Sequence, residues 1–259
     1  MATAVICEFN PFHNGHKYLL ESAKNVLKEP VIAIMSGSFT QRGEVAVCDK
    51  FVRAKSALEN GADLVLELPV VFSLSGAEGF AKAGVAIASA FDCTNHLAFG
   101  SESGDCELLK KSANAVCDER VQALVRDGMK NGGYYPRELE NAVKMVFGDE
   151  ISSVLCEPNN ILGVEYIKAL NGTGVEPFSV ARTGAAHDSR IAGEGFASAS
   201  HIREMLRNGE NAKKYAPYIP DEITFPENLD RPLLYRLRTM TREDIAKLPD
   251  VGEGLENRI

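Results

Sequence analysis

The chain has 259 residues, of which 45% are hydrophobic and 25% are charged, and its formal net charge is -8 at pH 7. This is an ordinary globular composition, with enough length for one large domain or a domain with an appendage. The acidic balance argues against nonspecific binding of the whole surface to nucleic acid or to an anionic membrane. A polyanionic partner would therefore need a local basic patch.

The predicted strands come first in chain order. Apolar runs at 4–7, 31–35, 63–68 and 96–100 alternate with amphipathic stretches, and a fifth run follows at 178–182. This alternation is typical of a parallel sheet covered by helices. The sequence therefore predicts an α/β fold with a Rossmann-like parallel sheet.

Helices are predicted between these strands. A helix over about 50–60 has Asp49 as its N-cap and Gly61 just after its end. A mostly helical region covers about 105–170, with breaks at Gly132-Gly133 and Pro136. A Gly- and Ser-rich connection at 184–200 leads into a helix from about 200 to 208, and a Pro-rich and then helical tail follows Tyr215. The helix after the first strand has one apolar face, made by Leu19, Leu20, Ala23, Val26 and Leu27.

The cysteines and the N-terminal residues indicate the cellular compartment of the protein. Six cysteines, at 7, 48, 93, 106, 117 and 156, contain no C-x-x-C pair and have no histidine at metal-ligand spacing. We expect reduced, mostly buried thiols and no metal site built from protein side chains. There is no basic stretch followed by an apolar stretch at the N-terminus, and no window approaches the roughly 18 apolar residues of a membrane span. These features predict a cytoplasmic protein that does not cross a membrane.

A turn with two histidines follows the first strand, in AVICEFNPFHNGH at 4–16. If the strand ends near Cys7 and a helix begins near His13 to Gly15, both histidines lie at the carboxyl edge of the sheet, where ligands bind. The helix N-terminus favours phosphate there, and Gly15 lets an anion approach the backbone. His13 and His16 can each donate a hydrogen bond to phosphate oxygens as charge develops in a nucleotidyl transfer. A single histidine would more commonly be a half-buried structural side chain, but the H-x-G-H pattern after a strand favours phosphate chemistry.

A second phosphate site is predicted where the helix near residue 200 begins. In ASASHIR at 197–203, hydroxyl and N–H groups can hold phosphate, and Arg203 can add a charge-assisted hydrogen bond. The alternative is an ordinary serine N-cap with a solvent-facing arginine. Gly100, at the end of the fourth strand, leaves room for an adenine or ribose against the backbone.

Six blocks of the sequence, in order and over most of the chain, resemble one known family. The H-x-G-H turn looks like that of the nucleotidyltransferase superfamily that includes class I aminoacyl-tRNA synthetases and phosphopantetheine adenylyltransferases. The combination resembles the bacterial tRNA(Met) cytidine acetate ligase family. The blocks are EFNPFHNGH (8–16), MSGSFTQRGE (35–44), RAKSALENGADLVLELP (53–69), FGSESGD (99–105), PNNILGVEY (158–166) and ASASHIR (197–203).

The resemblance implies an ATP-dependent ligase. Such an enzyme forms acetyl-adenylate from acetate and ATP, releases pyrophosphate, and transfers the acetyl group to the wobble cytidine of elongator tRNA(Met), giving N4-acetylcytidine. His13 and His16 are then the catalytic residues. Mg²⁺ is expected with ATP, but no carboxylate cluster in the sequence identifies its ligands. The oligomeric state is not indicated.

The resemblance also implies which residues bind ATP. Gly100 and Asn159 match family positions that contact ATP, with Asn160 as the alternative to Asn159. Arg182 matches a basic position associated with the nucleotide, although a lone arginine at a strand end would be expected in solvent. The full predicted ATP set is Cys7, Glu8, Phe9, Asn10, Pro11, Phe12, Asn14, Gly15, Gly100, Asn159, Arg182, Ser198, Ser200 and Arg203.

A polar loop at 36–44 follows the second strand. Its two glycines disfavour a helix, and its cationic content suits a small carboxylate or a cytidine, although a solvated loop is the alternative. Gln41 and Arg42 are therefore candidate contacts to acetate, ATP or RNA. The residues expected to approach the same rim are Glu8, Asp49, Lys50, Arg53 and Lys55.

Two domains are expected. Residues 1–210 would form a nucleotidyltransferase-like ATP-binding domain with the helical insertion at about 105–170, and 211–259 would begin a helical C-terminal region that is truncated relative to the family. Residues 197–259 carry 10 Lys and Arg against 11 Asp and Glu, so the remaining charge of -7 lies in 1–196. The tail is thus the better candidate to meet RNA, and we expect this chain to bind tRNA weakly and with strong salt dependence.

Two other functions remain open on the sequence. A simple nucleotidyltransferase that adenylylates a small phosphorylated metabolite would share both phosphate motifs but would not need the loop at 36–44. A noncatalytic nucleotide- or RNA-binding module would keep the fold but not the reactive residues. The intact His13, Gly15, His16, Ser200 and Arg203 argue against such a module.

Overall fold

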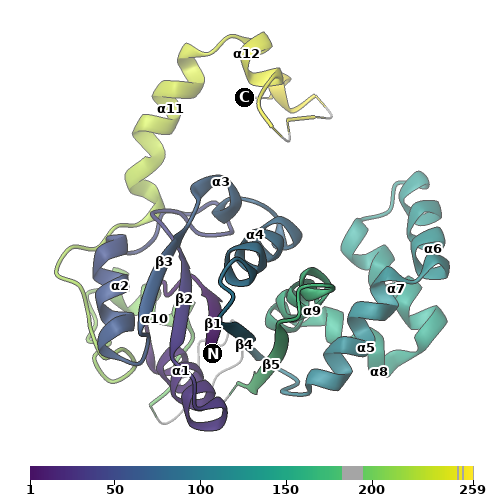
Figure 1. Cartoon of the computed structure of the whole chain (residues 1–259). Helices are drawn as coiled ribbons and strands as arrows, with labels where there is room; N and C mark the ends of the chain where they lie inside the picture. The colour runs from purple at the N-terminus through teal and green to yellow at the C-terminus, as the bar shows by residue number, and fades with distance from the viewer. Residues whose placement is uncertain (183–194, 250, 253, 259) are drawn as a thin grey trace.

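The computed structural model describes residues 1–182, 195–249, 251–252 and 254–258. Its described residues form a five-stranded sheet in the order β3-β2-β1-β4-β5, with every neighbouring pair parallel (Figure 1). The chain order reverses direction across the β1–β4 pair, which places the ligand-binding crevice of such a fold at the carboxyl ends of these two strands. The Rossmann-like prediction is confirmed. The strands are β1 Ala2–Cys7, β2 Val31–Ser36, β3 Leu64–Leu68, β4 Thr94–Ser101 and β5 Glu176–Ala181.

Helices cover both faces of the sheet because β1 is buried throughout and sends alternate side chains to opposite faces. Val5 packs with α1 (Asn14–Leu27) and α2 (Lys50–Glu59). Ile6 packs on the other face, with α4 (Ala77–Ser89), which follows the short α3 (Val70–Ser73), and with α9 (Pro158–Leu170).

The two predicted helices between the first strands are present. Asp49 accepts a hydrogen bond from the Phe51 N–H at 2.8 Å as the N-cap of α2, and Gly61 has a φ of +123° just after its end. In α1, Leu20 and Ala23 are buried as expected. The prediction is wrong for Val26. This residue lies in the last turn of α1, and its side chain is 64% exposed.

The helical prediction for 105–170 is confirmed. Pro136 does not interrupt a helix. It lies in the first turn of α7, where its missing N–H costs nothing. These helices pack on one another and on α9, to one side of the sheet (Figure 1). They are α5 Cys106–Cys117, α6 Glu119–Lys130, α7 Tyr135–Phe147, α8 Asp149–Ser153 and the 3-10 turn η1 Val154–Cys156.

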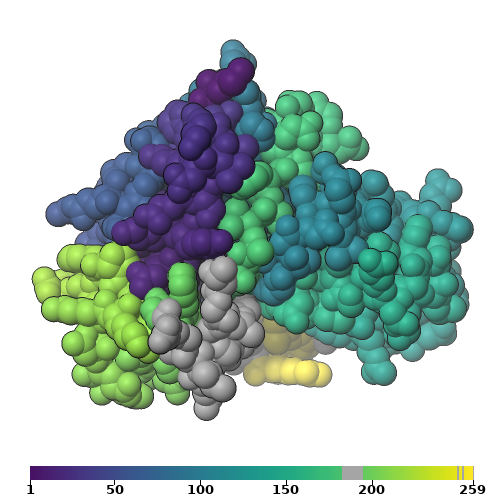
Figure 2. Space-filling model, turned by 90° about the horizontal axis from the view of Figure 1, so that it is seen from below, coloured from purple at the N-terminus to yellow at the C-terminus, as the bar shows by residue number. Residues whose placement is uncertain are grey.

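The last part of the chain returns to the start of the fold. The predicted helix is present as α10 (Ala199–Arg207), while most of the predicted connection before it lies outside the described residues. The segment after α10 lies beside the N-terminal residues (Figure 2), and the Asn14 N–H donates to the Tyr215 carbonyl at 2.8 Å. The remaining elements, which extend away from the sheet in Figure 1, are η2 Pro226–Leu229, α11 Asp230–Thr239, α12 Arg242–Ala246 and η3 Leu255–Asn257.

The cysteines only partly follow the prediction. All six are free thiols, and Cys7 and Cys48 are buried. Cys93, Cys117 and Cys156 are exposed, so the expectation of mostly buried thiols is wrong for these three. Cys93 lies just before β4, Cys117 is the last residue of α5, and Cys156 lies in the 3-10 turn η1. At these positions the side chains face solvent. Among the helices that the structure describes, none is long and apolar enough to cross a membrane.

Candidate functional site

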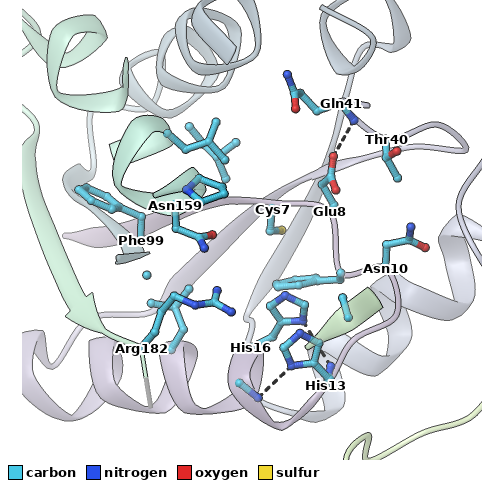
Figure 3. Close-up of a pocket in the computed structure, with 18 of the residues that line it drawn as sticks. Cys7, Glu8, Asn10, His13, His16, Thr40, Gln41, Phe99, Asn159 and Arg182 are labelled. Carbon is cyan, nitrogen blue, oxygen red and sulfur yellow. Dashed lines mark hydrogen bonds between the residues drawn. The ribbon is translucent and has the colours of Figure 1, made fainter. Parts of the chain in front are cut away.

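A cavity of about 390 Å³ opens at the carboxyl edge of the sheet (Figure 3). Its walls come from the turn after β1, the loop after β2, the ends of β4 and β5, and the first residues of α9 and α10. It brings together most of the residues predicted from the sequence. The predicted residues that line it are Cys7, Glu8, Phe9, Asn10, His13, Gly15, His16, Gln41, Arg42, Gly100, Asn159, Arg182, Ser200 and Arg203.

The two histidines build the start of α1. His13 is the N-cap, and its Nδ1 accepts a hydrogen bond from the Gly15 N–H at 3.0 Å. The His13 N–H in turn donates to Nδ1 of His16 at 3.3 Å, and the two rings stack with centroids 3.7 Å apart. Because both Nδ1 atoms accept, the proton of each neutral ring is on Nε2. The turn therefore offers two Nε2–H donors.

Both rings are held neutral. Burial, followed by the positive charges of Arg182 and Arg203, lowers the pKa of His13 to about 3. Burial and then the neighbouring His13 hold the pKa of His16 well below its ordinary value. At neutral pH the site therefore presents two neutral donors, and the positive charge comes from the arginines.

A carboxylate positions the start of α9. Glu102 Oε1 accepts from Asn159 Nδ2 at 2.6 Å, and its Oε2 accepts from the Asn160 N–H at 2.8 Å. This contact caps the positive end of the helix. Asn159 lines the cavity, whereas Asn160 is buried and accepts a hydrogen bond from the Ser103 N–H at 3.1 Å. The geometry thus assigns Asn159 to the cavity and Asn160 to the loop that carries Glu102.

Arg182 points into the cavity from the end of β5 (Figure 3). Its backbone N–H donates to the Ser101 carbonyl at 3.0 Å and continues the strand pairing. Its Nε is buried and has no hydrogen-bond partner in the described part of the chain. Burial lowers the pKa of this guanidinium, although Glu102 acts in the opposite direction. A buried cationic N–H without a partner among the described residues is suited to an anionic or polar ligand.

Arg203 links the two predicted phosphate motifs. Its Nη1 donates to the Asn10 carbonyl at 2.8 Å and its Nη2 to Ser200 Oγ at 3.3 Å. The contact joins residues 193 positions apart and sets the start of α10 beside the histidine turn. The starts of α1 and α10 therefore lie at the same cavity, with Arg203 between them.

Four residues of the predicted ATP set do not line the cavity. Pro11 and Phe12 are buried, and Phe12 packs on Phe9 with ring centroids 4.9 Å apart. Asn14 Nδ2 donates to the Gly195 and Lys214 carbonyls at 2.7 and 3.0 Å. Ser198 is buried and accepts from the His201 N–H as the N-cap of α10. These side chains face away from the cavity and hold the two turns in place.

The loop after β2 closes one side of the cavity. The Gln41 N–H donates to Glu8 Oε1 at 2.6 Å, and Gln41 Nε2 donates to the Ser75 carbonyl at 3.3 Å. Of the five residues expected to approach this rim, only Glu8 lines the cavity. The others have structural contacts: Asp49 caps α2, Lys50 and Lys55 form ion pairs with Glu67 and Glu59, and Arg53 is buried beneath the rim.

The apolar part of the lining was missed by sequence reasoning. Each of these side chains belongs to a strand or to the inner face of a helix, so its apolar character is already explained by the core. Only the spatial arrangement shows that they also face the cavity. They are Ile6, Leu19, Phe80, Phe99, Leu162, Tyr166 and Val180.

A parallel sheet with an H-x-G-H turn and a second helix N-terminus at one cavity defines a nucleotidyltransferase of the HIGH type. In agreement, the family model described as HIGH Nucleotidyl Transferase matches residues 1–259, so the chain belongs to this family. Within it, the chain is 39% identical over its whole length to the tRNA(Met) cytidine acetate ligase of Caldanaerobacter subterraneus subsp. tengcongensis, covering 69% of that protein. It is 36% identical to the ligase of Thermosipho africanus, with 98% of this chain and 64% of that protein covered. The chain belongs to the tRNA(Met) cytidine acetate ligase family.

Solved structures agree with this assignment. The apo form of Thermotoga maritima TmcAL matches with a TM-score of 0.90 and 34% identity, over 100% of this chain and 67% of that one. The same protein bound with alpha-thio ATP matches with a TM-score of 0.88 and 34% identity, over 66% of that chain. This chain spans about two thirds of the length of the relatives it matches.

Proposed function

We propose that this chain is an ATP-dependent acetate ligase that forms acetyl-adenylate and transfers the acetyl group to the wobble cytidine of elongator tRNA(Met), giving N4-acetylcytidine. The observation that carries the proposal is that one cavity holds two neutral histidine donors together with the Nε of Arg182, which has no hydrogen-bond partner among the described residues. The names of the relatives and the alpha-thio ATP of the Thermotoga maritima structure support it.

ATP would lie across the carboxyl ends of β1 and β4. Gly100, Asn159 and Arg182 would contact the adenosine, and the starts of α1 and α10 would hold the phosphates, with Ser200 and Arg203 as side-chain donors. The apolar lining would receive the adenine ring. Mg²⁺ would neutralise phosphate charge, and the described residues contain no group of three His, Cys, Asp or Glu side chains that would hold it without the nucleotide.

In the first half-reaction an acetate oxygen attacks the α-phosphorus, and the bond to the bridging oxygen breaks to release pyrophosphate. The Nε2–H groups of His13 and His16 would stabilise the charge on the phosphate oxygens, where pre-placed donors are most effective. Cys7 is poorly suited to act as a nucleophile, because burial raises the pKa of its thiol and the thiol donates to the Ile34 carbonyl at 3.7 Å. The acetyl group would therefore pass from the adenylate to the tRNA without a thioester intermediate. Gln41 and Arg42 are candidate contacts to acetate.

We also propose the domain division predicted from the sequence, with the ATP-binding unit in 1–210 and the start of a helical region in 211–259. Supporting this division, α11 buries none of its side chains in the structure. A tRNA-modifying enzyme of this kind would work in the cytoplasm.

The test is exchange of labelled pyrophosphate into ATP, measured with and without acetate. We expect exchange that depends on acetate. Exchange stimulated instead by a small phosphorylated metabolite would identify a simple nucleotidyltransferase, and ATP binding without exchange would identify a noncatalytic module. Either result would contradict the proposed function.

A further inference from the structure

Glu8 is a cavity residue whose carboxylate does not suit the phosphate chemistry of its neighbours. It follows the last residue of β1 and lies with Thr40 and Gln41, on the opposite side of the cavity from Asn159 and Arg182 (Figure 3). An ionised carboxylate only accepts hydrogen bonds, so it repels a triphosphate and cannot donate to one. Because Glu8 lies across the cavity from Asn159 and Arg182, it is placed to contact a ligand group other than the triphosphate.

The contacts of Glu8 hold the carboxylate in place and leave one oxygen available. Oε1 accepts the Gln41 N–H at 2.6 Å. In the described part of the chain, no hydrogen bond reaches Oε2, and Arg53 donates to the backbone carbonyl of Glu8 rather than to its carboxylate. The group is therefore oriented by the loop after β2, with an acceptor left for a donor in the cavity.

We infer that Glu8 receives the amine of the acceptor cytidine: its Oε2 accepts a hydrogen bond from the N4 amine and then takes the proton that this amine loses. This role rests on the proposed function. The N4 nitrogen forms a bond to the acetyl carbon, the bond from that carbon to the adenylate oxygen breaks, and AMP leaves with the electron pair. A carboxylate is the side chain that matches the N4–H₂ donor of cytosine.

Four other titratable side chains of the cavity, those of His13, His16, Cys7 and Tyr166, are poorly suited to this step. His13 and His16 use Nδ1 for backbone hydrogen bonds, and the pKa of each is lowered. Burial raises the pKa of Cys7 and of Tyr166, so both stay protonated. Burial also raises the pKa of Glu8, against the Gln41 N–H and the charges of Arg203, Arg42 and Arg53, and a more basic carboxylate is a better proton acceptor.

The test compares Glu8→Gln with Glu44→Gln, which removes an exposed carboxylate at the same rim. Three rates are measured for each: acetate-dependent pyrophosphate exchange, acetohydroxamate formation with hydroxylamine, and acetyl transfer to elongator tRNA(Met) at low salt. Hydroxylamine is reactive enough to trap the adenylate without a base. For Glu8→Gln we expect exchange and hydroxamate formation at the wild-type rate, and acetyl transfer slower by about 10² to 10⁴. Glu44→Gln should leave all three rates unchanged.

The possible outcomes separate the two proposals. If wild type shows no acetate-dependent exchange, the proposed function fails, and the role of Glu8 fails with it. If exchange is intact and Glu8→Gln transfers acetyl to tRNA as fast as wild type, only the role of Glu8 is overturned. The same conclusion follows if Glu8→Gln loses exchange and transfer equally while its thermal unfolding matches wild type. If wild type forms the adenylate but acetylates no tRNA, the transfer step of the proposed function fails, and the role of Glu8 fails with it.

Discussion

Arg53 is a buried cation that supports the floor of the site. It is 1% exposed, and its guanidinium donates to backbone carbonyls at the ends of β1 and β2 and before α2. Nη1 donates to the Glu8 and Ser36 carbonyls at 2.6 and 3.1 Å, Nε donates to the Cys48 carbonyl at 3.3 Å, and Nη2 donates to the Gly37 carbonyl. We predict that Arg53→Met destabilises the protein strongly, since methionine fills much of the same space but donates no hydrogen bond.

The size of the effect follows from these four contacts. A hydrogen bond to a charged group contributes about 1.5 to 3 kcal/mol, so the four together set an upper bound of roughly 6 to 12 kcal/mol. The actual loss of stability is smaller than this bound. The variant no longer buries a charged guanidinium, and water can hydrogen-bond to the freed carbonyls. We expect the free energy of unfolding to fall by about 4 kcal/mol, a large share of the roughly 5 to 15 kcal/mol typical of a protein.

The assay is urea unfolding followed by circular dichroism, with Lys55→Met as the control on the solvent side of the same helix. The control should change the free energy of unfolding by no more than about 0.5 kcal/mol. Arg53→Lys should fall between wild type and Arg53→Met, because one ammonium cannot reach all four carbonyls. A loss below about 1 kcal/mol for Arg53→Met would refute the reasoning, since a single ordinary hydrogen bond would account for it.

Three further predictions concern the cavity. His16→Ala should slow acetate-dependent pyrophosphate exchange by about 10² to 10³ with little change in ATP affinity, because its donor acts on developing charge; equal losses of rate and affinity would make it a ground-state contact. Arg182→Gln should weaken ATP binding by about 10- to 100-fold in calorimetry, but it should not change unfolding, since the Nε has no protein partner in the described chain. The unfolded state binds a proton on His13 below about pH 6.5 whereas the folded state resists it down to about pH 3, so stability is full above 6.5 and is lost as pH falls. This residue alone should cost about 2 kcal/mol between pH 7 and pH 5, and His13→Asn, which keeps a capping side chain, should show a shallower pH slope.

The sequence alone was sufficient for the sheet and for the starts of α1 and α10 at its carboxyl edge. Most of β1 and β2 is apolar, in the runs 4–7 and 31–35, and strands of a parallel sheet buried on both faces are typically such runs. The histidine turn was also predictable, because its cap, its glycine and its contacts are local. The Gly15 N–H, for example, donates a hydrogen bond to Nδ1 of His13, two residues away. Contacts of this kind involve residues that are close in the sequence. The sequence therefore predicts the start of α1 to within a residue or two.

Tertiary structure decided which side chains reach the cavity. Sequence adjacency grouped Phe12 and Asn14 with His13, but the turn points them into the core and toward Gly195 and Lys214. The same limit applied to Arg53, whose burial depends on carbonyls from three separate segments. The pairing of Arg203 with the Asn10 carbonyl joins residues 193 positions apart, and no local periodicity reports such a contact. The sequence by itself determined the kinds of chemical group present at the sheet edge, and packing between distant segments determined which of them face the ligand and which hold the others in place.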